Sequence, residues 1–161
     1  MDLQQRVRQL GEVLVRQGLM LATAESCTGG WVAQELTAVA GSSAWFERGF
    51  VTYSNEAKQE MLAVSAVTLA QFGAVSEEVV SEMALGAIQH SRAQLSVAIS
   101  GVAGPGGGSA EKPVGTVCFG WARQAGEVIS RKECFEGDRE AVRRQAVVMA
   151  IQGLRELIDD D

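Results

Sequence analysis

Histidine is nearly absent from this chain of 161 residues, which contains only His90. Hydrolases with a Ser-His-Asp or Cys-His site must therefore use His90 or are excluded. Zinc sites of the common Cys/His kinds are disfavoured as well, because one histidine offers few ligands and no C-x-x-C motif occurs.

Cysteine is scarce and long apolar runs are missing. The three cysteines lie at unrelated spacings and do not make a disulfide framework, which favours a reducing cytoplasm. No apolar run is long enough to span a membrane. The first residues, Met-Asp-Leu-Gln-Gln-Arg, lack the basic-then-apolar plan of a signal peptide. We expect a cytoplasmic protein with no membrane partner.

Basic residues are outnumbered, with 14 Lys and Arg against 20 Asp and Glu, so the net charge is −6. This balance argues against non-specific nucleic-acid binding, which draws on excess positive charge. Hydrophobic residues make up 47% of the chain, enough to fill a core. With no internal repeat and no long linker, residues 1–161 are expected to form one domain.

Apolar periodicity predicts the element order α β α β α α β β β α. This alternation with a late hairpin indicates an α/β fold, a mixed sheet with helices on both faces. Strands are expected at about 20–25, 46–53, 95–100, 114–123 and 128–135. Helices are expected from Leu3 to Gly18, at 30–39, from 54–56 onward, at 68–72, from 76 to 92 and from Asp138 to 158.

Turns rich in polar residues or glycine follow three predicted strands, at residues 25–30, 53–58 and 100–109. A fourth turn, 137–139, opens the last helix. Ligands of open α/β sheets bind at the carboxyl ends of the strands. The first three turns therefore predict a single site at that edge.

Ser26 is the candidate nucleophile of the first turn, and the alternative is a serine that only caps a helix. Gly29 and Gly30 let the backbone approach a ligand, so their N–H groups are suited to a phosphate or an oxyanion. Cys27 is a competing nucleophile. His90, the usual partner of a cysteine, is expected at the other edge of the sheet, so we favour a structural Cys27.

Lys58 is the candidate base, although most lysines are solvated surface charges. It lies one turn into a helix that starts at a strand end, where the helix dipole and desolvation both disfavour its protonated form. A neutral amine accepts a proton from serine in the Ser-Lys variant of nucleophilic catalysis. Tyr53, the only tyrosine, either relays a proton or is an ordinary strand aromatic.

The loop from Gly101 to Pro113 resembles a phosphate-binding loop in composition but lacks the P-loop pattern, and a flexible lid is the alternative. Arg139 is placed to pair with a carboxylate or phosphate. Arg143 and Arg144 are expected on the solvated face of the last helix.

These turns closely resemble those of the CinA C-terminal-domain family, in particular its stand-alone nicotinamide mononucleotide deamidases (PncC type). The matching segments cover nearly the whole chain: 23–33, 41–58, 100–105 with 107–109, 112–117 and 137–139. Gly106 departs from the family, where an acidic or polar residue is frequent.

The resemblance implies a three-layer fold, often dimeric, and an amidohydrolase of pyridine nucleotide recycling without metal or cofactor. It implies conversion of nicotinamide mononucleotide to nicotinate mononucleotide and ammonia. On the family pattern Ser26 is the nucleophile and Lys58 the base, with Tyr53 assisting. The expected substrate-binding residues are Thr28, Gly29, Gly30, Asn55, Gly101, Gly104 and Arg139.

Two other functions remain open. One is a non-catalytic module that binds a pyridine nucleotide, because this domain type also occurs fused to another domain. The other is a phosphoryl-transfer enzyme that uses the glycine-rich loops. The second would need Mg²⁺, and no cluster of Asp and Glu is placed for that ion.

Overall fold

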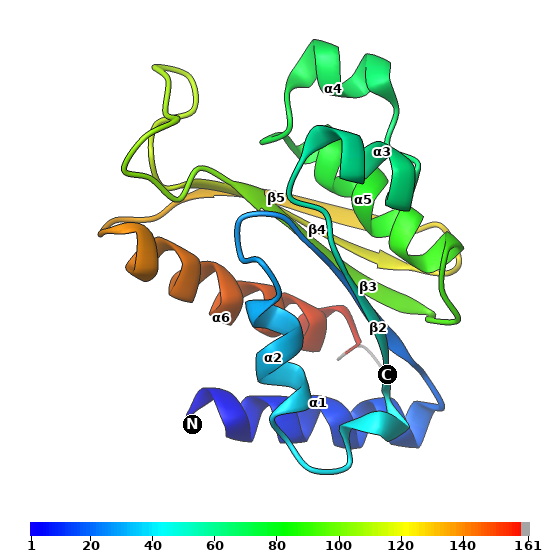
Figure 1. Cartoon of the computed structure of the whole chain (residues 1–161). Coiled ribbons are helices and arrows are strands. Elements are labelled where there is room, and N and C mark those ends of the chain that lie inside the picture. The colour runs from blue at the N-terminus through cyan, green and yellow to red at the C-terminus, as the bar shows by residue number, and fades with distance from the viewer. Residues whose placement is uncertain (159–161) are drawn as a thin grey trace.

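A computed structural model describes residues 1–158 as a single sheet between two layers of helices (Figure 1). The predicted α/β fold is confirmed. The prediction of a single domain also covers residues 159–161, which lie outside the described residues. The elements are α1 (Leu3–Gln17), β1 (Leu21–Glu25), α2 (Trp31–Thr37), the 3₁₀ turn η1 (Ser42–Ala44), β2 (Phe46–Val51), α3 (Asn55–Leu62), α4 (Ala66–Phe72), α5 (Glu77–Gln89), β3 (Leu95–Gly101), β4 (Thr116–Arg123), β5 (Val128–Cys134) and α6 (Arg139–Leu157).

The sheet has the strand order β2-β1-β3-β4-β5. The strands β2, β1 and β3 are parallel, and β4 and β5 continue the sheet as an antiparallel hairpin. The carboxyl ends of the three parallel strands therefore meet at one edge. The turns after them, which the sequence marks as functional, are brought together there.

Side chains alternate between the two faces of the sheet, as a strand requires. Large apolar side chains face the core shared with α1, α2 and α6: Leu21, Leu95, Val97, Ile99, Val117, Phe119 and Trp121. Small side chains face α3, α4 and α5: Ala22, Ala24, Ala98, Cys118 and Ala122. Because these are small, α5 packs close to the sheet, where the Ser96 hydroxyl donates to the Ala84 carbonyl at 2.6 Å.

Several predicted boundaries shift by one to three residues. β2 ends at Val51 because the carbonyls of Thr52 and Tyr53 turn toward a side chain of α3. β4 begins at Thr116 because Gly115 has a φ of +99° and donates its N–H to the Val102 carbonyl. The helix predicted to reach residue 92 ends at Gln89.

None of the helices within residues 1–158 is both long and apolar enough to cross a membrane.

Candidate active site

The orientation of Ser26 follows from the alternation along β1. The pairing with β3 continues one residue past the strand, because the Ser26 N–H donates to the Ile99 carbonyl at 2.9 Å. Ser26 therefore faces the layer that contains α3, whereas Cys27 belongs to the core on the side of α2 and α6. The two adjacent nucleophile candidates point in different directions, as expected from the sequence.

Lys58 reaches Ser26 from the first turns of α3. The helix begins after Ser54, whose hydroxyl accepts the Ala57 N–H at 3.0 Å. Lys58 is only 1% exposed, and its Nζ lies 3.0 Å from Ser26 Oγ. The same nitrogen lies 2.9 Å from the Thr52 carbonyl oxygen and 3.2 Å from that of Tyr53.

Burial lowers the pKa of Lys58, because desolvation penalises the charged ammonium. No carboxylate lies within ion-pair distance of this ammonium in the described part of the chain. The neutral amine is therefore favoured more than in an exposed lysine. A neutral amine beside a serine hydroxyl is the arrangement that Ser-Lys chemistry requires.

Cys27 lies beside this pair but in a different chemical state. Its side chain is buried, and burial raises the pKa of its thiol to about 11. His90 is exposed at the end of α5, and its ring Nδ1 lies 2.8 Å from the Gly86 carbonyl oxygen. This places the histidine near the start of β3, at the sheet edge opposite Ser26, so Cys27 has no imidazole partner.

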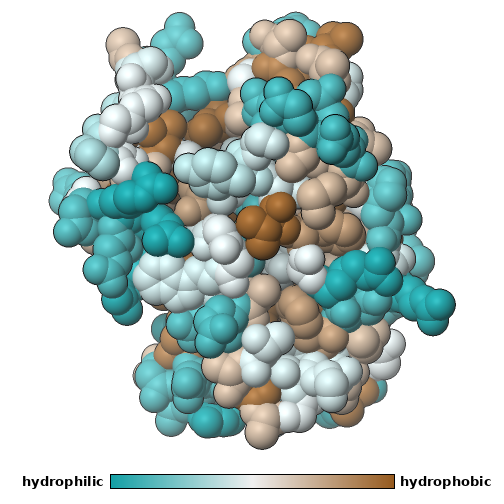
Figure 2. All heavy atoms as spheres, viewed as in Figure 1, coloured by the Kyte–Doolittle hydropathy of each residue, from teal (hydrophilic) through white to brown (hydrophobic). Residues whose placement is uncertain are grey.

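A cavity of about 290 Å³ opens beside Ser26 and Lys58. This is near the lower end of the range of about 300–1,000 Å³ found for ligand sites. In the space-filling view a notch opens at the top of the molecule, between the protruding glycine-rich loop and the α3–α4 pair (Figure 2). The predicted site residues that line the cavity are Ser26, Tyr53, Asn55, Lys58, Gly101, Gly104 and Arg139.

Thr28, Gly29 and Gly30 do not line this cavity. The Thr28 side chain is fully buried, and its hydroxyl donates to Glu25 at 2.6 Å, so it holds the turn and is not open to a ligand. Gly29 and Gly30 have φ angles of +58° and +106°, which side-chain-bearing residues rarely adopt. The Gly-Gly pair is thus required by the turn between β1 and α2.

Sequence reasoning missed Glu25. Its side chain is 1% exposed, and its carboxylate accepts the N–H groups of Val32 at 2.9 Å and Ala33 at 3.0 Å. It therefore caps the first turn of α2 from inside the fold. A buried acidic residue just before a Gly-Gly helix start is the signal that points to such a cap.

The expectation that Arg143 lies on a solvated face is wrong. From the second turn of α6 it reaches the Ser26 turn, where Nε donates to the Cys27 carbonyl at 3.0 Å. Its guanidinium also lies 5.4 Å from the ring centre of Trp31. Arg144, the next residue, is exposed as expected and pairs with Glu140.

The remaining candidates form the walls of the cavity. Arg139 donates from Nη1 to the Gly104 carbonyl at 2.7 Å, which ties α6 to the glycine-rich loop. Lys112 ties the far end of that loop to α4, by donating to the Phe72 carbonyl at 2.5 Å. The Tyr53 side chain is 65% exposed at the cavity, and within residues 1–158 its hydroxyl has no partner.

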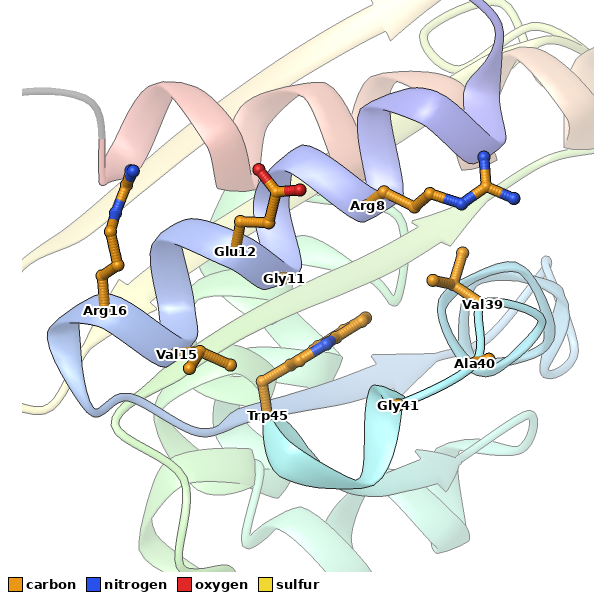
Figure 3. Close-up of a pocket in the computed structure, with 9 residues that line it drawn as sticks. All are labelled: Arg8, Gly11, Glu12, Val15, Arg16, Val39, Ala40, Gly41 and Trp45. Atoms are coloured by element: carbon orange, nitrogen blue, oxygen red, sulfur yellow. The ribbon is translucent and has the colours of Figure 1, made fainter.

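A second cavity, of about 660 Å³, lies away from this site between α1 and the segment that precedes β2 (Figure 3). Arg8, Glu12 and Arg16 surround it, and the Trp45 indole lies beneath Gly11. Its lining contains no serine, cysteine, lysine or histidine, so it offers no Ser-Lys, Ser-His or Cys-His pair. The described residues contain no group of three His, Cys, Asp or Glu side chains placed to hold a metal ion.

Comparison with known proteins agrees with this geometry. A family model described as the CinA C-terminal domain matches residues 3–158. The chain belongs to this family. It is 62% identical to a protein of Escherichia coli K12 named nicotinamide-nucleotide amidohydrolase PncC, over 95% of this chain and 93% of that protein.

Other members of the CinA family extend the comparison. A Pseudomonas putida protein of the same printed name is 54% identical, over 92% of each chain. The crystal structure of the competence/damage inducible protein CihA from Agrobacterium tumefaciens matches with a TM-score of 0.95. That pair shares 46% sequence identity, over 98% of this chain and 96% of the other.

Proposed function

We propose that this CinA-family chain hydrolyses the carboxamide of nicotinamide mononucleotide, giving nicotinate mononucleotide and ammonia in pyridine nucleotide recycling. The observation that carries the proposal is the 3.0 Å contact between Lys58 Nζ and Ser26 Oγ inside the cavity. The printed names of relatives that share 54–62% of this sequence give the substrate class.

The surroundings of Lys58 suit a neutral amine in detail. A neutral amine has two N–H groups and one lone pair, whereas an ammonium has three N–H groups. In the structure Nζ donates to the carbonyls of Thr52 and Tyr53 and to Ser26 Oγ, and the Ser26 hydroxyl donates to the Tyr53 carbonyl at 3.4 Å. When the amine is neutral, the two carbonyls accept its N–H groups and its lone pair faces Ser26 Oγ, so the serine hydroxyl turns from the Tyr53 carbonyl to Lys58 as it gives up its proton.

The chemistry then takes two steps. As the Ser26 oxygen attacks the carboxamide carbon, its proton moves to Lys58, and the tetrahedral oxyanion binds backbone N–H groups of the Ser26 turn. The carbon–nitrogen bond breaks, and the lysine returns the proton to the departing ammonia. Water attacks the acyl-enzyme by the same route and releases the carboxylate.

The cavity walls provide the contacts for the nucleotide. Apart from the bond to Gly104, the Arg139 guanidinium has no acceptor within residues 1–158, so it is free to bind the phosphate or ribose. The Asn55 amide is exposed at the same cavity and has no partner there. Tyr53 is proposed to assist proton transfer once substrate fills the space. A homodimer and a cytoplasmic location remain predictions from the family resemblance.

One assay tests the proposal and its rivals. Purified protein is incubated with nicotinamide mononucleotide, nicotinamide riboside or NAD, and ammonia release is measured with and without EDTA. We expect release from the mononucleotide that EDTA does not change. Tight binding of the mononucleotide without ammonia release would favour a non-catalytic binding module. Full ammonia release in EDTA would exclude Mg²⁺-dependent phosphoryl transfer as the function.

A further inference from the structure

Arg143 connects the last helix to the turn that carries the nucleophile. Its Nε donates to the Cys27 carbonyl at 3.0 Å, and its Nη2 lies 3.4 Å from the Thr28 carbonyl oxygen. The guanidinium stacks on the Trp31 ring, and the residue is half-buried. One side chain thus binds two successive carbonyls of the Ser26 turn.

The Ser26 turn needs such external support. Gly29 and Gly30 have no side chains with which to anchor it, and both have left-handed backbone angles. Glu25 holds one side of the turn through the Thr28 hydroxyl and the N–H groups that follow. Arg143 holds the other side, through carbonyls that Glu25 does not reach.

The turn leaves one N–H group available beside the nucleophile. Cys27 lines the cavity together with Ser26, and its N–H donates to no other residue within residues 1–158. Thr28 is fully buried, and the Gly29 N–H donates to the Ser26 carbonyl at 3.1 Å, so neither of these N–H groups is open to a ligand.

We propose that Arg143 is a positioning residue that holds the two peptides after Cys27, so that Ser26 Oγ keeps its direction for attack and the Cys27 N–H binds the oxyanion that forms. Hydrogen bonds from a charged guanidinium are stronger than neutral ones, and two of them from one side chain fix the direction of both peptides. The proposal rests on the amidohydrolase function. It assigns a role in the reaction to a residue that does not line the substrate cavity.

The chain offers a matched control in Arg144. This residue also lies on α6 and over the Trp31 ring, at 5.5 Å, but its guanidinium pairs with the exposed Glu140 and not with the turn. Replacing either arginine with alanine removes one positive charge and one contact with Trp31. Only the Arg143 replacement removes the hydrogen bonds to the Ser26 turn.

The test compares steady-state ammonia release from nicotinamide mononucleotide by wild type, Arg143→Ala, Arg143→Lys and Arg144→Ala. Loss of an interaction made only in the transition state lowers kcat and leaves KM, so for Arg143→Ala we expect kcat to fall by about tenfold or more while KM changes by less than about twofold. Arg143→Lys, which keeps the charge and one donor, should lie between that variant and wild type. Arg144→Ala should match wild type.

Chemical rescue separates this role from a structural one. Added guanidinium ions, at concentrations well below those that denature the protein, should restore part of kcat in Arg143→Ala and leave Arg144→Ala unchanged. An Arg143→Ala kcat equal to that of wild type would overturn the role of Arg143 while leaving the amidohydrolase function standing. Absence of ammonia release by wild type would overturn both. If Arg143→Ala does not fold, the same criteria apply to Arg143→Lys.

Discussion

The amine of Lys58 and the hydroxyl of Ser26 lie 3.0 Å apart, and the lysine is 1% exposed. Among residues 1–158 no carboxylate offsets its burial, and two backbone carbonyls accept N–H groups of its amine. This arrangement lowers the pKa of a lysine at a point where a hydroxyl needs a base. It accounts for hydrolytic chemistry in a chain whose only histidine lies at the other edge of the sheet.

The pH dependence of the reaction should follow the titration of Lys58. The base is active when neutral, so kcat/KM should rise with pH through the lowered pKa of Lys58 and level off above it. The midpoint of this limb should lie below about 10.4, the value for an unperturbed lysine. A profile of ammonia release against pH measures the limb. A rate that falls as pH rises through this region would contradict a neutral amine base.

Stability should change with pH because of the same group. The unfolded chain holds the Lys58 proton up to about pH 10.4, whereas the folded protein loses it at lower pH. In that interval the unfolded state binds more protons, so the contribution of Lys58 to the free energy of unfolding rises with pH. Replacing Lys58 with methionine should remove this rise.

Urea unfolding of wild type and Lys58→Met at several pH values measures the difference. Subtracting one from the other cancels the opposite trend from the buried thiols of Cys27 and Cys118, whose pKa values are raised to about 11. We expect wild type to gain stability relative to Lys58→Met as pH rises. A difference that stays constant would show that Lys58 titrates alike in both states.

Cys27 should be inert. A thiol that is buried and has a pKa of about 11 is almost entirely protonated near neutral pH, and the thiolate is the reactive form. Iodoacetamide should therefore label the exposed Cys134 and leave both Cys27 and ammonia release unchanged. Peptide mapping by mass spectrometry locates the label. Rapid labelling of Cys27 with parallel loss of activity would favour a cysteine nucleophile.

Glu25→Gln should weaken the fold. The carboxylate accepts hydrogen bonds with both oxygens, from Thr28, Val32 and Ala33. An amide replaces one of these oxygens with a donor that faces an N–H group or the Thr28 hydroxyl, which should cost about 1–3 kcal/mol of unfolding free energy. Urea unfolding measures the loss.

Glu35→Gln provides the control for that variant. One oxygen of Glu35 accepts the Trp31 indole N–H at 3.1 Å, and the amide oxygen of a glutamine keeps that bond. Its unfolding free energy should stay within about 0.5 kcal/mol of wild type. Equal losses of unfolding free energy in the two variants would show that the Glu25 hydrogen bonds stabilise the fold no more than the single bond of Glu35 does.

The parts of the site that depend on local sequence could be predicted. Strand alternation carries Ser26 to one face and Cys27 to the other, and the turn after β2 brings Lys58 to a helix start. These relationships involve neighbours along one strand or one helical turn. The mixed sheet and the two-sided helical cover are confirmed for the same reason, because apolar periodicity reports directly on which faces are buried. The predicted element order has two helices between the second and third strands, whereas the structure has three, α3, α4 and α5.

The supporting residues could not be predicted in this way. Arg143 lies 116 residues from Cys27, and whether it faces solvent or the turn depends on how α6 packs against the sheet. The sequence predicts that Thr28 binds the substrate, but its hydroxyl donates to the buried Glu25 carboxylate, a contact that the sequence does not indicate. The end of β2 was misplaced because the carbonyls of Thr52 and Tyr53 bind Lys58, which periodicity does not report.

The most direct test of the Ser26–Lys58 site is ammonia release from nicotinamide mononucleotide by wild type, Ser26→Ala and Cys27→Ala, each shown to be folded by circular dichroism. The account predicts that Ser26→Ala releases no ammonia above background while Cys27→Ala releases it at a rate of the same order as wild type. Turnover by Ser26→Ala close to that of wild type would contradict the assignment of Ser26 as the nucleophile.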